Sequence, residues 1–419
     1  MDEKINNIIG DKNISIKEIN KKQILKIILE KGPISRIEIS KYLNISRPTT
    51  TSYINELISS RLIEETGKSK STPLGGKKAV LIKFNEKAGY ILGVMIGVKN
   101  TRIALADLNS NILKSIKIPT EQWLGPEHVI KKIIVNLELV IKESGISKGD
   151  FIGIGIGSPG LVDSKTGTVI FSPNMEDWKN IALKEIIERQ AGLPVFIENE
   201  CRVQAIAEKK FGLAKKLKDF VCFEIGTGVG TGVYVGDKLL IGIKGMAGEL
   251  GHVTINIDDS RVCHCGNTGC LESLCSTKSL LDDIKEKFKN ENYKGSIDFE
   301  NLKEEELYEL YEQGNEIVVK NVEKNAEYLG IGISNAVKIF SPKLIIIHGE
   351  VIKFGEKYLN IVKNSVAKNT FPMVQEVYDI QFSKLGENVG LIGVTSIVFD
   401  RIFNLDNPDI PGHYILKRE

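Results

Sequence analysis

The chain has 419 residues, of which 42% are hydrophobic and 26% are charged, and its formal net charge is +2 at pH 7. This length allows two or three domains, and the composition is that of a globular protein rather than a disordered or fibrous one. No apolar run approaches the ~20 residues that a transmembrane helix needs, and the first residues lead into no apolar signal segment. We therefore expect a cytoplasmic protein that does not enter a membrane.

Basic charge is concentrated in the first part of the chain. Residues 1–85 hold 16 Lys and Arg against 9 Asp and Glu, a balance of +7, so the remainder carries a balance of −5. Such a segment is either an ordinary solvated surface or a surface that binds a polyanion such as nucleic acid. The pattern of elements within the segment decides between the two.

Three helical patterns follow one another in this basic segment. The first carries closely spaced Ile and Leu residues and ends at Gly32, which is followed by proline. Ser35 begins the second helix, with Glu38 at the spacing of a capping box, and Ser46 caps the third. Two short helices joined by a tight turn predict a helix-turn-helix motif.

The third helix is predicted to lie in the major groove of DNA. Its exposed polar side chains are short enough to let the helix approach, and an arginine there can bond a guanine or a phosphate. The candidate residues are Ser46, Arg47, Thr49, Ser52 and Asn55. Two extended stretches then flank Gly75-Gly76, as in the wing of a winged helix, where Lys77 and Lys78 are expected to contact phosphates.

A three-helix protein-interaction module is the alternative for this segment. The polar start of the third helix and the basic hairpin occur together, however, and this combination favours DNA binding. The sequence therefore predicts a winged helix-turn-helix DNA-binding domain over residues 1–85.

From about residue 86 the chain alternates strands and helices. Strands are expected at 90–96, 101–107, 112–118, 151–156, 195–197, 220–225, 232–235 and 238–241, and a helix at 126–144. The strands form two similar series, each opening with a hairpin, and a glycine run over 226–232 lies in the second series. Two such α/β halves predict a two-lobed, actin-like domain over residues 86–419, with a cleft between the lobes.

A cluster of cysteines predicts a metal site. Cys263, Cys265 and Cys270 supply three thiolates, and His252 can supply a nitrogen. Three sulfurs and one imidazole make a closed tetrahedral set that suits structural zinc and leaves no position for water. His264 is an additional candidate that we expect to be exposed. The remaining cysteines are expected to be buried thiols: Cys201, Cys222 and Cys275.

The motifs together resemble the ROK family, which contains repressors, open reading frames and sugar kinases. The resemblance covers nearly the whole chain, and its most specific stretch is Glu249 to Glu272. It is supported by Lys87-Ala88-Gly89-Tyr90, Ser158-Pro159-Gly160-Leu161-Val162-Asp163, Phe171-Ser172-Pro173-Asn174 and Phe196-Ile197-Glu198-Asn199-Glu200. Within the family the chain most resembles the xylose repressors of Gram-positive bacteria.

The resemblance implies an actin-like sugar-kinase fold, a zinc site at the matching cysteines and histidine, and a homodimer or homotetramer. It also implies double-stranded operator DNA and a monosaccharide, xylose or a related sugar, as partners.

A sugar pocket is expected in the cleft. Carboxylates and amides hydrogen-bond the hydroxyl pairs of a sugar, often beside one aromatic wall. The positions that match or flank the pocket of the ROK kinases are Asn174, Asn199, Glu200, Glu249, His252 and Glu272. In the family the histidine touches both metal and sugar. Glu249 and Glu272 could instead only support the zinc site, and Trp178 is a candidate for the aromatic wall.

The phosphate-handling positions differ from those of the family's kinases. The first phosphate loop of the family typically reads Asp-x-Gly-Gly-Thr, whereas this chain has Met95–Lys99, in which Val98 would crowd a phosphate. The nucleotide-base loop, usually a Gly-Gly-Gly run, reads His348-Gly349-Glu350. The second phosphate loop is intact, and Glu200 aligns with the catalytic Asp. Since phosphoryl transfer needs all of these parts, we expect no enzyme activity and assign no catalytic residue.

The leading hypothesis is a sugar-responsive, DNA-binding transcriptional repressor. The resemblance to xylose repressors implies that it regulates xylose-utilisation genes. Closure of the lobes around the sugar would alter the affinity for DNA. An active ATP-dependent ROK sugar kinase with an accessory domain is one alternative. A regulator controlled by a protein partner is the other.

Overall fold

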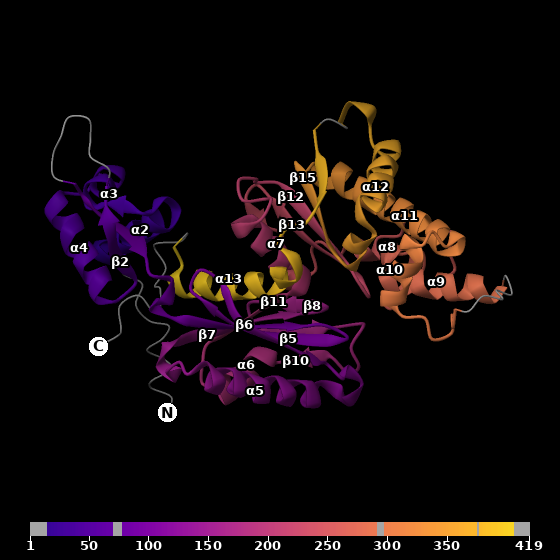
Figure 1. Ribbon diagram of the computed structural model, residues 1–419, viewed down its shortest axis with the longest axis horizontal. Helices are drawn as coiled ribbons and strands as arrows, with labels where there is room; N and C mark the ends of the chain where they lie inside the picture. Colours follow the sequence, from indigo (N-terminus) through magenta and orange to yellow (C-terminus); the bar gives the residue numbers. More distant parts are fainter. Residues whose placement is uncertain (1–14, 70–77, 291–296, 375–376, 406–419) are drawn as a thin grey trace.

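The computed structural model describes residues 15–69, 78–290, 297–374 and 377–405. These residues form a small N-terminal unit followed by two α/β lobes, with one long helix between the lobes (Figure 1). The two central sheets have five strands each, and two smaller sheets have three strands each. None of the helices that the structure describes is long and apolar enough to span a membrane.

The N-terminal unit is a winged helix, as predicted. Ser35 caps its second helix and shares a capping box with Glu38, and Ser46 Oγ accepts a hydrogen bond from the backbone N–H of Thr49. The strands pair in the order β1-β3-β2. The elements are α2 (Ile16–Lys31), β1 (Ile34–Ser35), α3 (Arg36–Leu43), α4 (Arg47–Ser59), β2 (Ile63–Lys68) and β3 (Val80–Phe84). Gly75, Gly76 and Lys77 lie outside the described residues.

The first lobe is built on a sheet with the order β11-β7-β4-β5-β6. Its strand β7, between β11 and β4, is buried along its whole length, because helices α5 and α6 lie on one face of the sheet and α13 (Val389–Phe403) lies on the other (Figure 1). A small sheet, β10-β9-β8, adjoins it. The elements are β4 (Tyr90–Ile96), β5 (Asn100–Asp107), β6 (Ile112–Pro119), α5 (Gly125–Ser144), β7 (Phe151–Ser158), β8 (Leu161–Asp163), β9 (Thr168–Phe171), β10 (Lys179–Ile181), α6 (Leu183–Ala191) and β11 (Val195–Asn199).

The second lobe repeats this connectivity with the order β14-β13-β12-β15-β16. In both lobes a hairpin is followed by two strands parallel to its first strand. The elements are α7 (Glu200–Phe211), β12 (Phe220–Ile225), β13 (Val229–Val235), β14 (Lys238–Leu239), α8 (Leu271–Cys275), α9 (Thr277–Asn290), α10 (Glu304–Glu312), α11 (Glu316–Phe340), β15 (Leu344–Gly349), α12 (Gly355–Asn369) and β16 (Asp379–Phe382).

The glycine run is shared between a turn and a strand. Only Gly226–Gly228 form the turn, and β13 begins at Val229, earlier than the sequence predicts. The reason is the packing of α7 on this strand: a side chain at Gly230 would lie 2.2 Å from Cys201 Sγ, and one at Gly232 would lie 2.5 Å from a methyl of the same helix. The later glycines are therefore needed for close contact between the strand and the helix.

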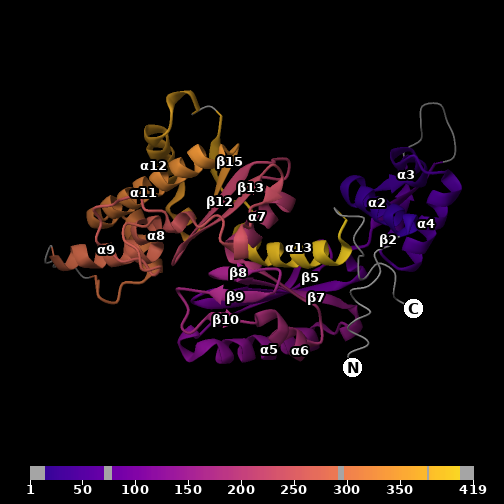
Figure 2. The ribbon, with the colours of Figure 1, turned by 180° about the vertical axis from the view of Figure 1, so that it is seen from behind.

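Helix α13 (Val389–Phe403) connects all three parts of the molecule. It packs on β4 and β7 of the first lobe and on α7 of the second lobe. Its far end lies beside the winged helix (Figure 2). There the ring of Phe399 meets that of Phe84 edge-to-face, with 5.9 Å between the ring centroids. The winged helix and this end of α13 thus share one buried apolar core.

Candidate functional site

The predicted metal ligands come together in a small knuckle beside the cleft. The ligand atoms of His252, Cys263, Cys265 and Cys270 all lie within 4.8 Å of one another. Cys263 Sγ is 3.5 Å from His252 Nδ1, and Cys265 Sγ is 3.7 Å from Cys270 Sγ. Two sulfurs bound tetrahedrally at ~2.3 Å from zinc are separated by about 3.8 Å, so this donor set fits a zinc ion. His264 is exposed and outside the set, as expected.

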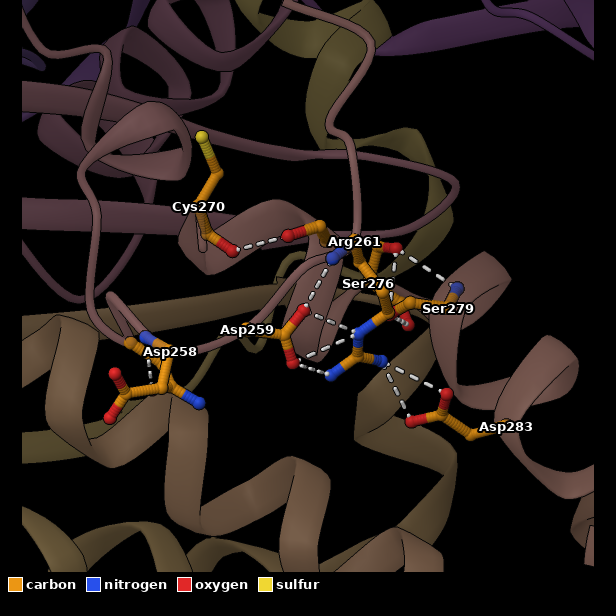
Figure 3. Close-up of polar contacts among 9 residues, drawn as sticks. Asp258, Asp259, Arg261, Cys270, Ser276, Ser279 and Asp283 are labelled. Carbon is orange, nitrogen blue, oxygen red and sulfur yellow. Dashed lines mark hydrogen bonds and ion pairs between the residues drawn. The ribbon is translucent and has the colours of Figure 1, made fainter. Parts of the chain in front are cut away.

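An arginine attaches the knuckle to the second lobe (Figure 3). The guanidinium of Arg261 donates two hydrogen bonds to the carboxylate of Asp283 on α9, at 2.9 and 3.0 Å. It also bonds Asp259 in its own loop, at 2.9 Å from Nη2 to Oδ2. On the other side of the knuckle, the carbonyl of Cys270 accepts a hydrogen bond from Ser273 Oγ in α8. The loop is therefore held by polar contacts of its own, independent of any metal ion bound by the four predicted ligands.

A cavity of about 280 Å³ lies between the two lobes next to the knuckle. The first lobe contributes the turn after β7 and the loop after β9, and the second contributes the glycine turn and the knuckle. All the residues predicted for the sugar pocket line this one cavity: Asn174, Asn199, Glu200, Glu249, His252 and Glu272. The structure thus brings together side chains that lie nearly a hundred positions apart in the chain.

Asn199 shapes the corner at which strand β11 becomes helix α7. Its Oδ1 accepts hydrogen bonds from the backbone N–H groups of Cys201 and Arg202, at 2.9 and 3.1 Å, and its Nδ2 donates to the carbonyl of Gly160 at 2.9 Å. These bonds aim the next residue, Glu200, into the cavity. Only the second N–H of the Asn199 amide is left for a ligand.

Arg202 joins the two lobes behind this corner. It forms a buried ion pair with Glu198 at 2.6 Å. Its Nη2 donates to the carbonyl of Val162 in the first lobe, and its Nη1 donates to the carbonyl of Gly245 in the second. Because these donors are buried and bonded on both sides, the start of α7 is a fixed point between the lobes.

Glu272 contacts both the knuckle and the glycine turn. Its Oε2 accepts a hydrogen bond from the backbone N–H of Val229 at 2.9 Å, and its Oε1 lies 3.6 Å from Cys263 Sγ. Glu272 can therefore support the predicted metal site and line the cavity at the same time. His252 does the same, because its Nδ1 faces Cys263 and its Nε2 is left for a second partner.

Glu224 and Ser172 are among the cavity residues that the sequence prediction missed. Glu224 lies at the end of β12, where an acid in an otherwise apolar strand just before the glycine turn was an available signal. The hydroxyl of Ser172 is buried, lines the cavity and has no hydrogen-bond partner among the described residues. Ser172 belongs to the motif Phe171-Ser172-Pro173-Asn174, but the motif does not show that its hydroxyl reaches the cavity, because this position depends on the fold of both lobes.

Burial makes the cavity acids weak. Burial, together with the charges of Glu224 and Glu272, raises the pKa of Glu200 to about 8. Burial raises the pKa of Glu224 to about 7, although a hydrogen bond with Gln204 acts to lower it. The pKa of Glu249 is also raised by burial, although His252 and Arg202 oppose the rise. Part of this set therefore holds protons at neutral pH and can donate as well as accept hydrogen bonds to a hydroxyl-rich ligand.

Trp178 does not form an aromatic wall. Its side chain is 1% exposed and packs in the apolar core of the first lobe, away from the residues that line the cavity. The loop that carries Asn174 thus faces the cavity on one side and the core on the other. The sequence does not reveal which side each residue takes.

The residues at the altered phosphate-handling positions have packing or charge partners of their own. The thioether of Met95 lies between Gly157 of β7 and Gly390 of α13, where a side chain on either glycine would clash with it. His348 is buried beside Glu208 of α7, and burial lowers its pKa to about 3. Its imidazole is therefore neutral and contributes no charge to the lobe.

The predicted DNA-contacting residues lie on the surface of the winged helix. Arg47, Ser52 and Asn55 are exposed on α4, Thr49 is half-buried, and Ser46 is exposed at its cap. Arg36 Nη2 donates to Asn55 Oδ1 at 3.3 Å and to Glu65 Oε1 at 2.8 Å, so Arg36 positions the amide of Asn55. Lys78 is exposed, and Lys77 lies outside the described residues.

Comparisons with known proteins match two separate segments of the chain. A sequence model of the ROK family matches residues 91–401, and a model described as winged helix-turn-helix DNA-binding matches residues 14–64. The xylose repressor of Bacillus spizizenii is 34% identical over 392 residues, which cover 93% of this chain and 97% of the relative.

One solved structure matches nearly the whole chain, and another matches about three quarters of it. A ROK family transcriptional regulator, described as a homologue of the E. coli MLC protein, has a TM-score of 0.77 at 28% identity and covers 94% of this chain and 99% of its own. A ROK family glucokinase from Streptomyces griseus, in complex with glucose and AMPPNP, has a TM-score of 0.66 at 29% identity. The glucokinase covers 74% of this chain and 99% of its own.

Proposed function

Because the chain belongs to the ROK family and carries a winged helix-turn-helix ahead of the ROK domain, we propose that it is a sugar-responsive, DNA-binding transcriptional repressor of xylose-utilisation genes. The xylose repressor of Bacillus spizizenii matches this chain over nearly its whole length, and this similarity supports xylose as the effector. The cavity supports a monosaccharide, because amide, imidazole and carboxyl groups converge on it from both lobes.

The observation that carries the proposal is the continuous path from the cavity to the DNA-binding unit. Helix α7 begins at Glu200 in the cavity and packs on α13 so closely that a side chain at Gly393 would lie 2.0 Å from the carbonyl of Val203. Helix α13 then ends at Phe399 and Phe403 in the core of the winged helix. A rotation of the lobes around a bound sugar therefore moves the element on which the winged helix rests.

Such a movement acts on DNA through the spacing of two recognition helices. We propose a homodimer or homotetramer in the cytoplasm, in which two α4 helices must match half-sites about one DNA turn apart (~34 Å). A small change in their separation lowers the affinity for the operator, with xylose as the inducer. Zinc in the knuckle is proposed as a structural ion, because four protein ligands leave no position for a reacting water.

The protein is proposed to be a regulator and not an enzyme. Phosphoryl transfer needs groups that hold Mg²⁺ and the phosphates of ATP. Met95 is packed between glycines, and Lys99 is paired with a carboxylate, so neither supplies such a group. The intact glycine turn, Gly226–Gly228, favours the alternative of a ROK sugar kinase, which is tested by incubating the protein with ATP, Mg²⁺ and each sugar.

Titration with xylose, glucose and N-acetylglucosamine tests the proposal. Melting temperature and affinity for DNA upstream of candidate genes are measured in the same samples, at one stated salt concentration. Xylose is expected to raise the melting temperature and to release DNA. Phosphorylation of a sugar above background would support the kinase. DNA binding that ignores all three sugars would support control by a protein partner.

A further inference from the structure

An ion pair crosses between the lobes where no sugar-binding residue has been assigned. Lys99 lies in the turn of the β4–β5 hairpin of the first lobe, and Glu304 is the first residue of α10 in the second. Lys99 Nζ is 2.7 Å from Glu304 Oε1. The Lys99 side chain is 57% exposed, whereas that of Glu304 is only 15% exposed. We refer to Lys99 and Glu304 as the interlobe ion pair.

The end of the interlobe ion pair in the first lobe is held by a rigid turn. The backbone N–H of Gly97 donates to the carbonyl of Asn100 at 3.1 Å. Thr120 donates from its hydroxyl to the carbonyl of Gly97 at 2.7 Å and from its backbone N–H to the carbonyl of Lys99 at 3.0 Å. The hairpin turn therefore moves with the first lobe as one unit. Val98, next to Lys99, lines the cavity.

The end in the second lobe is connected to the glycine turn. Thr277 Oγ1 donates to Glu304 Oε1 at 3.2 Å, and the backbone N–H of Thr277 donates to the carbonyl of Gly226 at 2.8 Å. Gly226 itself lines the cavity. Lys99 is thus one residue away from one wall of the cavity, and Glu304 is connected to the opposite wall through two hydrogen bonds of Thr277.

The same face of α10 reaches a third segment. Tyr308 follows Glu304 by one helical turn, and its hydroxyl donates to Glu350 Oε2 at 3.4 Å while its ring packs on Phe354. Besides packing on α9 and α11, α10 therefore contacts, directly or through Thr277, the hairpin of Lys99, the glycine turn and the loop of Glu350. By resemblance, these three segments hold the nucleotide in ROK kinases.

We propose that α10 joins the two lobes through the interlobe ion pair and that Lys99 and Glu304 are positioning residues for sugar binding. The proposal rests on the proposed function for the identity of the sugar. An exposed ion pair contributes little to the stability of a rigid surface. Between two lobes that move relative to each other, it acts on the equilibrium between an open and a closed cleft.

Charge reversal tests the proposal in the full-length protein. Lys99→Glu and Glu304→Lys are each expected to weaken xylose binding about threefold to fivefold at low salt, the range of a partly exposed ion pair. The double variant restores the attraction with the charges exchanged, so its Kd is expected within about twofold of the wild type. Lys114→Glu, which breaks an exposed ion pair with Glu143 inside the first lobe, is the matched control and should leave the Kd unchanged.

Hydrogen exchange without sugar gives a second, independent measurement. The amides of α10 and of the hairpin turn are expected to exchange faster in each single variant and to recover in the double variant. Unchanged exchange, or unchanged sugar affinity in both single variants, would overturn the positioning role. If the wild type binds no sugar while exchange follows the expected charge pattern, the proposed effector fails and the interlobe contact stands.

Discussion

Buried carboxyl groups determine what the cavity can bind. Glu200 and Glu224 are held at the meeting point of two lobes, where burial raises the pKa of one to about 8 and of the other to about 7. A protonated carboxyl donates one hydrogen bond and accepts others, which suits a hydroxyl pair. At the scale of single residues, the cavity therefore favours a neutral sugar.

The raised pKa of Glu200 predicts a pH-dependent stability. The folded protein keeps a proton on Glu200 that the unfolded chain, with a pKa of 4.5, has released. This contribution is fully present below pH 4.5 and is lost as the pH rises towards 8, by up to about 1.4 kcal/mol per pH unit. Between pH 6 and 8 the melting temperature of the wild type should fall more steeply than that of Glu200→Gln.

The control for this pH dependence is Glu185→Gln, whose side chain is 74% exposed in the wild type. Its pH profile should match that of the wild type. Equal slopes for the wild type and Glu200→Gln would show that Glu200 ionises normally in the folded protein.

Loss of one thiolate should release the metal. Cys265→Ala leaves three of the four ligand atoms and opens the tetrahedral set, so the zinc content should fall from one per chain towards zero. The melting temperature should fall with it. Metal analysis and a thermal scan check both effects. Cys222→Ala, which removes a buried thiol outside the knuckle, should keep its zinc.

The role of a residue could be predicted from the sequence where it follows from a local spacing pattern. It could not be predicted where it depends on neighbours that lie far away in the chain. The four predicted metal ligands lie in a short stretch of the chain, and their residue types and spacing alone were enough to predict a site at which the structure brings them together. Ser172 becomes a candidate only because β9 delivers its hydroxyl to a cavity whose other wall comes from a different lobe. Trp178 is of a residue type that often packs against sugars, but its side chain lies in the apolar core of the first lobe.

At the scale of elements, helix α4 and helix α13 differ in how much of their surface is buried. The first presents polar side chains to solvent, and the second buries almost all of its residues between the other parts. Local signals predicted the first helix, because capping residues and periodicity lie within one element. The contacts of α13 and α10 involve residues hundreds of positions apart, such as Lys99 and Glu304, and no local pattern encodes them.

Arg47 should contribute to DNA affinity without affecting the cavity. Arg47→Ala is expected to weaken operator binding by about 1–3 kcal/mol, roughly fivefold to 150-fold, if the arginine bonds a guanine. Xylose affinity should be unchanged, because α4 lies in the winged helix, away from the cavity residues. The measurement is a binding titration at fixed salt with a labelled operator fragment.

A matched variant with the same charge change is Arg189→Ala, at a 70% exposed site on the first lobe. Its operator affinity should equal that of the wild type. An equal loss in both variants would mean that overall charge, and not the recognition helix, carries the effect.

Phe399 should carry the signal from the cavity to the winged helix. Phe399→Leu keeps the site apolar but removes the edge-to-face contact with Phe84 and the stacking on Phe403, together about 1–2 kcal/mol. The ratio of operator affinities without and with xylose should shrink at least threefold, while xylose affinity stays within about twofold of the wild type.

Phe288→Leu is the control for this substitution, because Phe288 is fully buried in the second lobe and belongs to a different apolar core. It should lower the melting temperature and leave the ratio of operator affinities intact. A wild-type ratio in Phe399→Leu would contradict transmission through this end of α13.

The whole molecule has three parts joined by few elements. Two lobes with the same strand connectivity face each other across the cavity, and α7 and α13 pack together between them. Arg202 and the interlobe ion pair add polar contacts on either side of the cavity. A molecule of this kind changes shape by rotating its lobes about the shared helices, with each sheet remaining intact.

Sugar binding should therefore make the protein more compact. Small-angle X-ray scattering of the wild type is expected to show a smaller radius of gyration in saturating xylose than without sugar. The Lys99→Glu variant should be more expanded than the wild type when no sugar is present, because its lobes repel at the interlobe contact. Identical scattering curves with and without bound xylose would exclude closure as the response.

The shared core of α13 and the winged helix also affects how the chain folds during synthesis. Phe84 and Phe399 are neighbours in the folded protein, but a ribosome adding ~5–20 residues per second reaches the second on the order of tens of seconds after the first. Until then, the apolar side of the winged helix that α13 covers stays open to solvent. A chain interrupted before α13 therefore lacks part of the apolar core of its DNA-binding unit as well as the helix that links this unit to the two lobes.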